Sequence, residues 1–135
     1  MDATRFHAAP GQLASERLGD YQVREARLGP FTVAFESIPA GFPPHGPALY
    51  QGLPDHACQV PHWGYVFRGL MRFIHSDGSE QVVAGGEAYY VPPGHRSECL
   101  VDAETVEFSP TEDMDRHNEI VSRNIARLAI TKSPA

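Results

Sequence analysis

Short runs of aromatic and β-branched residues alternate with glycine and proline along most of the chain, a pattern that predicts an antiparallel β fold. Strands are expected at 21–28, 31–38, 64–68, 70–75, 81–83, 88–91, 98–101 and 105–108. The pair Asp77-Gly78 predicts a hairpin turn between two of them, at 70–75 and 81–83. Many short strands in succession are typical of a β-sandwich or a β-barrel.

Three segments break this pattern. A short helix is expected at 13–18, and the proline-rich stretch 39–54 is expected to form a surface loop, because proline cannot donate to a strand ladder. Ser109-Pro110-Thr111-Glu112 offers an N-cap, a proline at the first helical position and a glutamate three residues after the cap. A C-terminal helix is therefore expected at about 110–129, with an apolar stripe that packs on the barrel or on a partner subunit.

Length and composition restrict the class of protein. A chain of 135 residues fits one domain, here 1–135, with a barrel at about 21–108. The net charge of -6, without a basic cluster, argues against a nucleic-acid partner. No apolar stretch approaches the roughly 20 residues of a membrane span, and no secretory signal is visible. We therefore expect a cytoplasmic protein without a membrane partner, whose two cysteines are thiols.

The stretch HACQVPHWGYVFRG, residues 56–69, carries the candidate chemistry. His56, Cys58 and His62 lie at even offsets, so an extended segment would point all three to one side. Imidazole nitrogen and thiolate sulfur bind zinc, copper, iron or nickel, whereas magnesium and calcium prefer oxygen. Taken alone, the three residues are only suggestive of a metal site, since buried or half-exposed packing positions explain them as well or better, and Pro61 interrupts the register between Cys58 and His62.

The stretch from His56 to about residue 108 resembles a small single-domain cupin, an RmlC-like β-barrel whose first motif reads G-x5-H-x-H-x3,4-E-x6-G. His56 stands at the first motif histidine, Cys58 at the second, His62 at the glutamate and Gly69 at the closing glycine. Gly86, Pro92 and Gly94 follow the second motif, G-x5-P-x-G-x2-H-x3-N. The resemblance implies an all-β cupin barrel with a C-terminal helix.

The ligand set departs from the usual three histidines and one glutamate, because Ser97 stands at the histidine of the second motif. His95 and Cys99 share the strand parity of Ser97, and either could replace it. The ligand set predicted from the resemblance is His56, Cys58, His62 and His95, holding a divalent transition metal such as Zn, Fe, Ni, Cu or Mn. A metal-free pocket is the alternative.

The resemblance also implies a function. A metal beside a pocket for a small organic molecule would suit an enzyme of the dioxygenase or isomerase type. The alternative is a module with a degenerate site that binds or senses a metal or a small ligand without turnover. Small cupins commonly pair, so a homodimer formed through edge strands or the C-terminal helix is expected.

Overall fold

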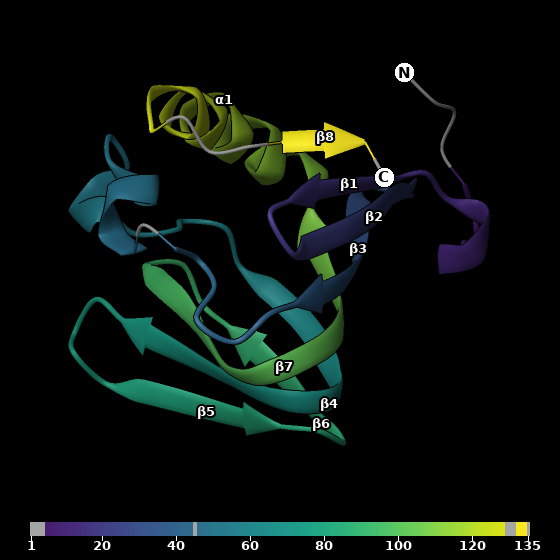
Figure 1. The fold of residues 1–135 in the computed structure, drawn as a ribbon, viewed down its shortest axis with the longest axis horizontal. Helices are drawn as coiled ribbons and strands as arrows, with labels where there is room; N and C mark the ends of the chain where they lie inside the picture. Colours follow the sequence, from purple (N-terminus) through teal and green to yellow (C-terminus); the bar gives the residue numbers. More distant parts are fainter. Residues whose placement is uncertain (1–4, 45, 129–131, 135) are drawn as a thin grey trace.

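A curved antiparallel sheet makes up most of the computed structural model, which describes residues 5–44, 46–128 and 132–134 (Figure 1). Its strands are β1 (Ser15–Leu18), β2 (Tyr21–Leu28), β3 (Phe31–Ile38), β4 (His62–His75), β5 (Glu80–Ala84), β6 (Glu87–Val91), β7 (His95–Pro110) and β8 (Lys132–Pro134). The order across the sheet is β5-β4-β7-β3-β2-β1-β8, and β6 pairs with β4 as well. The predicted all-β cupin barrel with a C-terminal helix is confirmed.

Two long strands, β4 and β7, close the barrel because each one bends midway. The first half of β4 pairs with β6 and the second half with β5, while β7 runs along both halves. The register between β4 and β7 shifts around Gly69, which has a φ of 97°. A Cβ atom at this position would lie 2.4 Å from the carbonyl oxygen of Asp102, so only glycine lets the strands cross this closely.

Most of the expected strands are confirmed, and several merge. The segments 21–28 and 31–38 are β2 and β3, and 81–83 and 88–91 fall within β5 and β6. The segments 64–68 and 70–75 form the single strand β4, and 98–101 and 105–108 form the single strand β7. The breaks between them were expected at Gly69 and at 102–104, where the strands bend without ending.

The expected helix at 13–18 is wrong, because this segment contains β1. Ser15 pairs with Arg24 of β2, and the guanidinium of Arg24 donates to the carbonyl of Leu13 at 2.7 Å. A turn containing Gly19, at a φ of 62°, returns the chain directly into β2. The available edge of the sheet therefore decides the conformation of this short segment, which is too short to stabilise a helix alone.

The C-terminal helix α1 (Thr111–Arg127) is confirmed, one residue later at its start than expected; 129 lies outside the described residues. Its N-cap residue is Pro110 and not the expected Ser109, whose hydroxyl lies 2.7 Å from His62 Nδ1. The expected loop 39–54 contains no strand among its described residues and includes the 3-10 helix η2 (Gly46–Tyr50). A second such helix, η3 (Pro54–His56), begins at the last residue of this stretch.

Two apolar clusters position the site. One fills the barrel and includes Val66, Phe73, Val91 and Cys99, each at most 2% exposed. The other packs α1 against η2 and the segment before β4; it contains Leu49, Tyr50, Leu53, Cys58 and Val60, with Met114, Ile120, Val121 and Ile125 of the helix. Figure 1 shows α1 at one end of the barrel. No helix within the described residues is long and apolar enough to cross a membrane.

Candidate metal centre

Three buried side chains from separate parts of the chain meet at the end of the barrel covered by α1. Cys58 and His95 oppose each other across an isolated antiparallel bridge, in which the Cys58 amide donates to the His95 carbonyl at 2.7 Å. His62 begins β4, where it pairs with Val91 of β6. One donor atom of each of Cys58, His62 and His95 lies within 4.8 Å of the others.

The two imidazoles present a free nitrogen to this cluster because their other nitrogens are engaged. His95 Nδ1 lies 2.8 Å from the carbonyl oxygen of Pro92, which can only accept, so Nδ1 carries the proton. His62 Nδ1 lies 2.7 Å from Ser109 Oγ and 3.2 Å from Glu107 Oε1. A proton on this nitrogen donates to these oxygens and leaves His62 Nε2 unprotonated, where it accepts from the Cys58 thiol at 3.6 Å.

Burial keeps all three groups uncharged. It lowers the pKa of His62 to about 4, and burial together with the neighbouring His62 lowers the pKa of His95 to about 4. Burial raises the pKa of the Cys58 thiol to about 12, and the negative charge of Glu107 adds to the rise. A divalent cation would supply the missing positive charge to the thiolate, and neutral imidazole is already the form that binds a metal.

The donor set therefore fits a metal ion. Two imidazole nitrogens and one sulfur converge without a carboxylate among them, and each imidazole is oriented by a hydrogen bond from its far nitrogen. Three protein ligands leave a coordination position open, as in catalytic zinc sites. The predicted binding of a metal by Cys58, His62 and His95 stays a prediction, with a geometry that suits it.

The structure places His56, the remaining member of the predicted ligand set, outside the cluster. Asp55 and His56 both have a positive φ, of 55° and 51°, which reverses the chain at the end of η3. The alternation expected between His56 and Cys58 therefore fails, because it requires an extended backbone. The side chain of His56 is exposed and lines a separate surface hollow with His75 and Arg96. The assignment of His56 as a ligand is corrected accordingly.

The two alternatives to His95 also lie outside the cluster. Ser97 hydrogen-bonds the hydroxyl of Tyr50 and lines the pocket beside it. Cys99 is 1% exposed in the barrel core, with its thiol 3.1 Å from the carbonyl oxygen of Val101. Of the three positions that the sequence left open, His95 is the one that the structure brings to Cys58 and His62.

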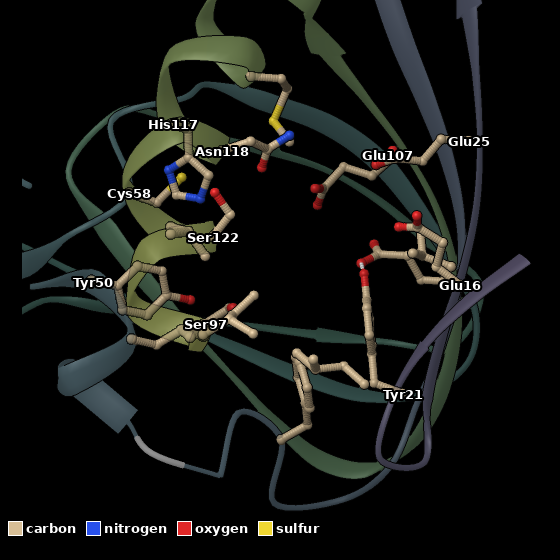
Figure 2. A pocket seen from close by; sticks show the side chains of 18 of the residues that line it. Glu16, Tyr21, Glu25, Tyr50, Cys58, Ser97, Glu107, His117, Asn118 and Ser122 are labelled. Carbon is tan, nitrogen blue, oxygen red and sulfur yellow. Dashed lines mark hydrogen bonds between the residues drawn. The ribbon is translucent and has the colours of Figure 1, made fainter. Parts of the chain in front are cut away.

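A pocket of about 370 Å³ opens beside the cluster, within the range that holds small organic ligands (Figure 2). Cys58, Tyr50 and Ser97 line one side, with His117 of α1. Leu49, Phe42, Met114, Val121 and Ile125 add an apolar surface. His117 had not been singled out in the sequence, because it follows no motif and reaches the pocket only through the packing of α1.

Carboxyl groups line the opposite side of the pocket, where Glu36 accepts from Tyr21 Oη at 2.6 Å and Glu107 from Tyr89 Oη at 2.6 Å. Burial raises the pKa of both carboxyls, and the charge of Glu107 raises that of Glu36 further. Neither glutamate had been singled out from the sequence as a site residue. The side chain of Glu107 is 17% exposed and faces His62.

The fold and the cluster together define a small cupin barrel with a candidate metal site. Comparison with family models finds no match, and comparison with curated proteins finds none either. Solved structures share the fold. An RmlC-like cupin from Shewanella frigidimarina is 18% identical with a TM-score of 0.57, over 82% of this chain and 95% of that one.

Two structures of proteins with named activities share the fold at lower identity. The polyketide cyclase RemF from Streptomyces resistomycificus is 15% identical with a TM-score of 0.52, over 77% of this chain and 78% of that one. A variant of Bacillus subtilis oxalate decarboxylase, an enzyme with Mn(II) centres, is 14% identical with a TM-score of 0.54. This match covers 82% of the present chain but only 30% of the decarboxylase. At these identities the likeness establishes the fold alone.

Proposed function

We propose that this protein binds a divalent transition metal through Cys58, His62 and His95 and acts on a small organic molecule in the adjoining pocket. The observation that carries the proposal is the convergence of three buried donor atoms within 4.8 Å, at the wall of a cavity of about 370 Å³. The thiolate favours zinc or iron(II) over manganese, which prefers oxygen ligands. Both cysteines are free thiols, and a reducing cytoplasm would keep Cys58 able to bind.

The chain's own residues supply the remaining parts of the site. When bound, such a metal polarises a carbonyl or enolate oxygen of a substrate, or supports dioxygen chemistry if it is iron. Ser109 and Glu107 hold His62 in the tautomer that leaves Nε2 free, and Pro92 does the same for His95. Glu36, with its raised pKa, holds a proton on the opposite wall, where a proton can be given to a bound substrate.

Elemental analysis of protein purified without an affinity tag or added metal tests the proposal. One zinc or iron per chain, with absorption from the Cys58 thiolate after replacement by Co²⁺, is the expected result. Protein that remains free of metal after incubation with Zn²⁺, Fe²⁺ and Co²⁺ would contradict it. Turnover of hydroxylated and carbonyl compounds, with oxygen consumption recorded, then distinguishes an isomerase from a dioxygenase and both from a binding module.

We propose further that two copies pair through an aromatic surface on the outside of the barrel. Its side chains are 36% to 57% exposed and come from β4, β6 and β7: Trp63, Tyr65, Phe67, Tyr90 and Phe108. The rings of Trp63 and Tyr90 lie 5.2 Å apart, as do those of Tyr65 and Phe67. Exposed aromatic surface of this kind is enriched at interfaces, and the same patch on two copies can pair around a twofold axis.

A further inference from the structure

His117 of α1 faces the same pocket as the three candidate ligands, but no part of the proposed metal site employs it. Its ring borders the open space of the pocket that Cys58 also lines (Figure 2). Its Nδ1 atom is buried and has no hydrogen-bond partner within the described structure. Because Nδ1 is shielded from solvent and has no acceptor beside it, the neutral ring carries its proton on Nε2, the nitrogen left to hydrogen-bond a molecule in the pocket.

The position of this ring is fixed by the packing of the helix. The Asn124 side-chain amide donates to the carbonyls of Leu49 and Gln51, both at 2.8 Å, and fastens α1 to η2 two turns beyond His117. The ring also lies 6.4 Å from that of Tyr50, at an angle of 45°. His117 is therefore held at the pocket wall by contacts on both sides.

We infer that His117 is a ligand-binding residue, which hydrogen-bonds a hydroxyl or carbonyl group of a small molecule held against the Cys58, His62 and His95 cluster. The inference rests on the proposed function, because the cluster holds the other end of the same molecule. His117 is not a further metal ligand, since it does not belong to the group of donor atoms that lie within 4.8 Å of one another. His117 therefore hydrogen-bonds the bound molecule and does not contact the metal.

The lining of the pocket indicates the class of this molecule. Asn118 and Ser122 of α1 add two further hydrogen-bonding side chains near His117. Arg17 is the one arginine that lines the pocket in the described part of the chain, and it is exposed. The lining thus offers hydrogen bonds, apolar surface and the carboxyl groups of the opposite wall, without a buried arginine to pair with a carboxylate. An uncharged hydroxylated or carbonyl compound fits this environment better than an organic diacid.

A binding experiment with acetohydroxamic acid tests the inference without any need for turnover. The probe is small and uncharged at neutral pH, and its carbonyl and hydroxyl oxygens can bind a metal while one of them accepts a hydrogen bond from His117. Wild-type protein and the variant His117→Phe, which keeps a ring of similar size, are loaded with Co²⁺ and titrated with the probe while the visible spectrum is recorded. His56→Ala, at the exposed histidine outside the cluster, is the matched control.

We expect wild type and all variants to bind one Co²⁺, and His117→Phe to bind the probe about tenfold more weakly, while His56→Ala matches wild type. His117→Ala serves as a second variant if phenylalanine does not fit. Unchanged probe affinity in folded His117 variants overturns this inference and leaves the proposed function intact. Loss of Co²⁺ from these variants also overturns it, because His117 would then be a metal ligand. Failure of wild type to bind Co²⁺ overturns the proposed function and this inference together.

Discussion

Cys58 and His95 exchange two backbone hydrogen bonds across an isolated bridge: the Cys58 amide donates to the His95 carbonyl at 2.7 Å, and the His95 amide donates to the Cys58 carbonyl at 3.1 Å. Residues directly opposed in an antiparallel pair project their side chains to the same side. The backbone therefore places a thiol and an imidazole together before any metal is bound. This bridge joins the chain before β4 to the beginning of β7.

The substitution Cys58→Ser should lower metal affinity more than about 100-fold, because it removes the thiolate donor of the cluster. Loss of a side chain that only hydrogen-bonds a metal ligand lowers affinity by up to about 100-fold, and loss of a ligand itself should cost more. Metal content by mass spectrometry and the Co²⁺ spectrum measure the change. Cys99→Ser is the matched control, since the Cys99 thiol lies in the core near the carbonyls of Ile38 and Val101. Equal metal content in wild type and Cys58→Ser would remove the cysteine from the site.

The substitution His56→Gly should leave metal binding unchanged and raise the free energy of unfolding by about 1 kcal/mol. Glycine adopts a positive φ without the steric cost that His56 has at 51°. Chemical denaturation and the Co²⁺ titration provide the two measurements. A large loss of Co²⁺ affinity in this variant would restore His56 to the ligand set and contradict the placement found here.

The sequence predicted β2, β3 and the C-terminal helix because long periodic segments determine their own conformation. It assigned His62 and Cys58 to a common site correctly in space, although the chain between them does not run as one strand. His56 was misplaced because two successive residues with positive φ carry no glycine to mark them. Parity along an assumed strand cannot detect such a reversal.

The other residues of the site depend on tertiary contacts that no local pattern contains. Glu107 alternates along β7 like any strand residue, and only the pairing of β7 with β4 brings it to His62. His117 lies on a helix whose position follows from packing against η2. Ser109 satisfies the pattern of an N-cap, but its hydroxyl bonds His62 Nδ1 in the folded chain.

The substitution Gly69→Ala should destabilise the barrel by about 3 kcal/mol, because a Cβ atom would lie 2.4 Å from the Asp102 carbonyl oxygen and 2.5 Å from Ala103 Cα. Gly86→Ala separates this contact from the backbone cost, since Gly86 has a similar φ of 90° and open space around it. That control should lose about 1 kcal/mol. If urea denaturation shows that Gly69→Ala and Gly86→Ala lose the same free energy of unfolding, the close crossing of β4 and β7 adds nothing to the cost of Gly69→Ala.

Substituting the aromatic surface should separate the proposed dimer. Replacement of Trp63 and Phe67 by serine removes two exposed rings that lie on one side of β4. We expect sedimentation velocity to show a dimer for wild type and a monomer for the double variant. Val82→Ser, at an exposed apolar position on β5 outside this surface, is the control. A wild-type monomer at all concentrations would contradict the proposed pairing.

The buried carboxyl of Glu36 should make the fold less stable as the pH rises. Burial and the neighbouring Glu107 raise its pKa from 4.5 to about 8, while Tyr21 and Thr105 donate hydrogen bonds to it. The unfolded chain loses this proton near pH 4.5, whereas the folded chain keeps it to about pH 8. The stability that protonated Glu36 contributes is therefore fully present below pH 4.5, and it is lost as the pH rises through the pKa of about 8 in the folded chain.

The variant Glu36→Gln keeps the shape of the side chain and cannot ionise, so this pH dependence should diminish. Between pH 5 and pH 8, the free energy of unfolding of Glu36→Gln should rise by about 2 kcal/mol relative to that of wild type, because wild type loses stability over that range. Removing the charge of Glu36 also eases the ionisation of Glu107, which adds to the gain at high pH. Urea denaturation at both pH values measures the difference, with Glu119→Gln on the exposed face of α1 as the control. Parallel pH profiles for Glu36→Gln and wild type would show that Glu36 ionises as freely in the folded chain as in water.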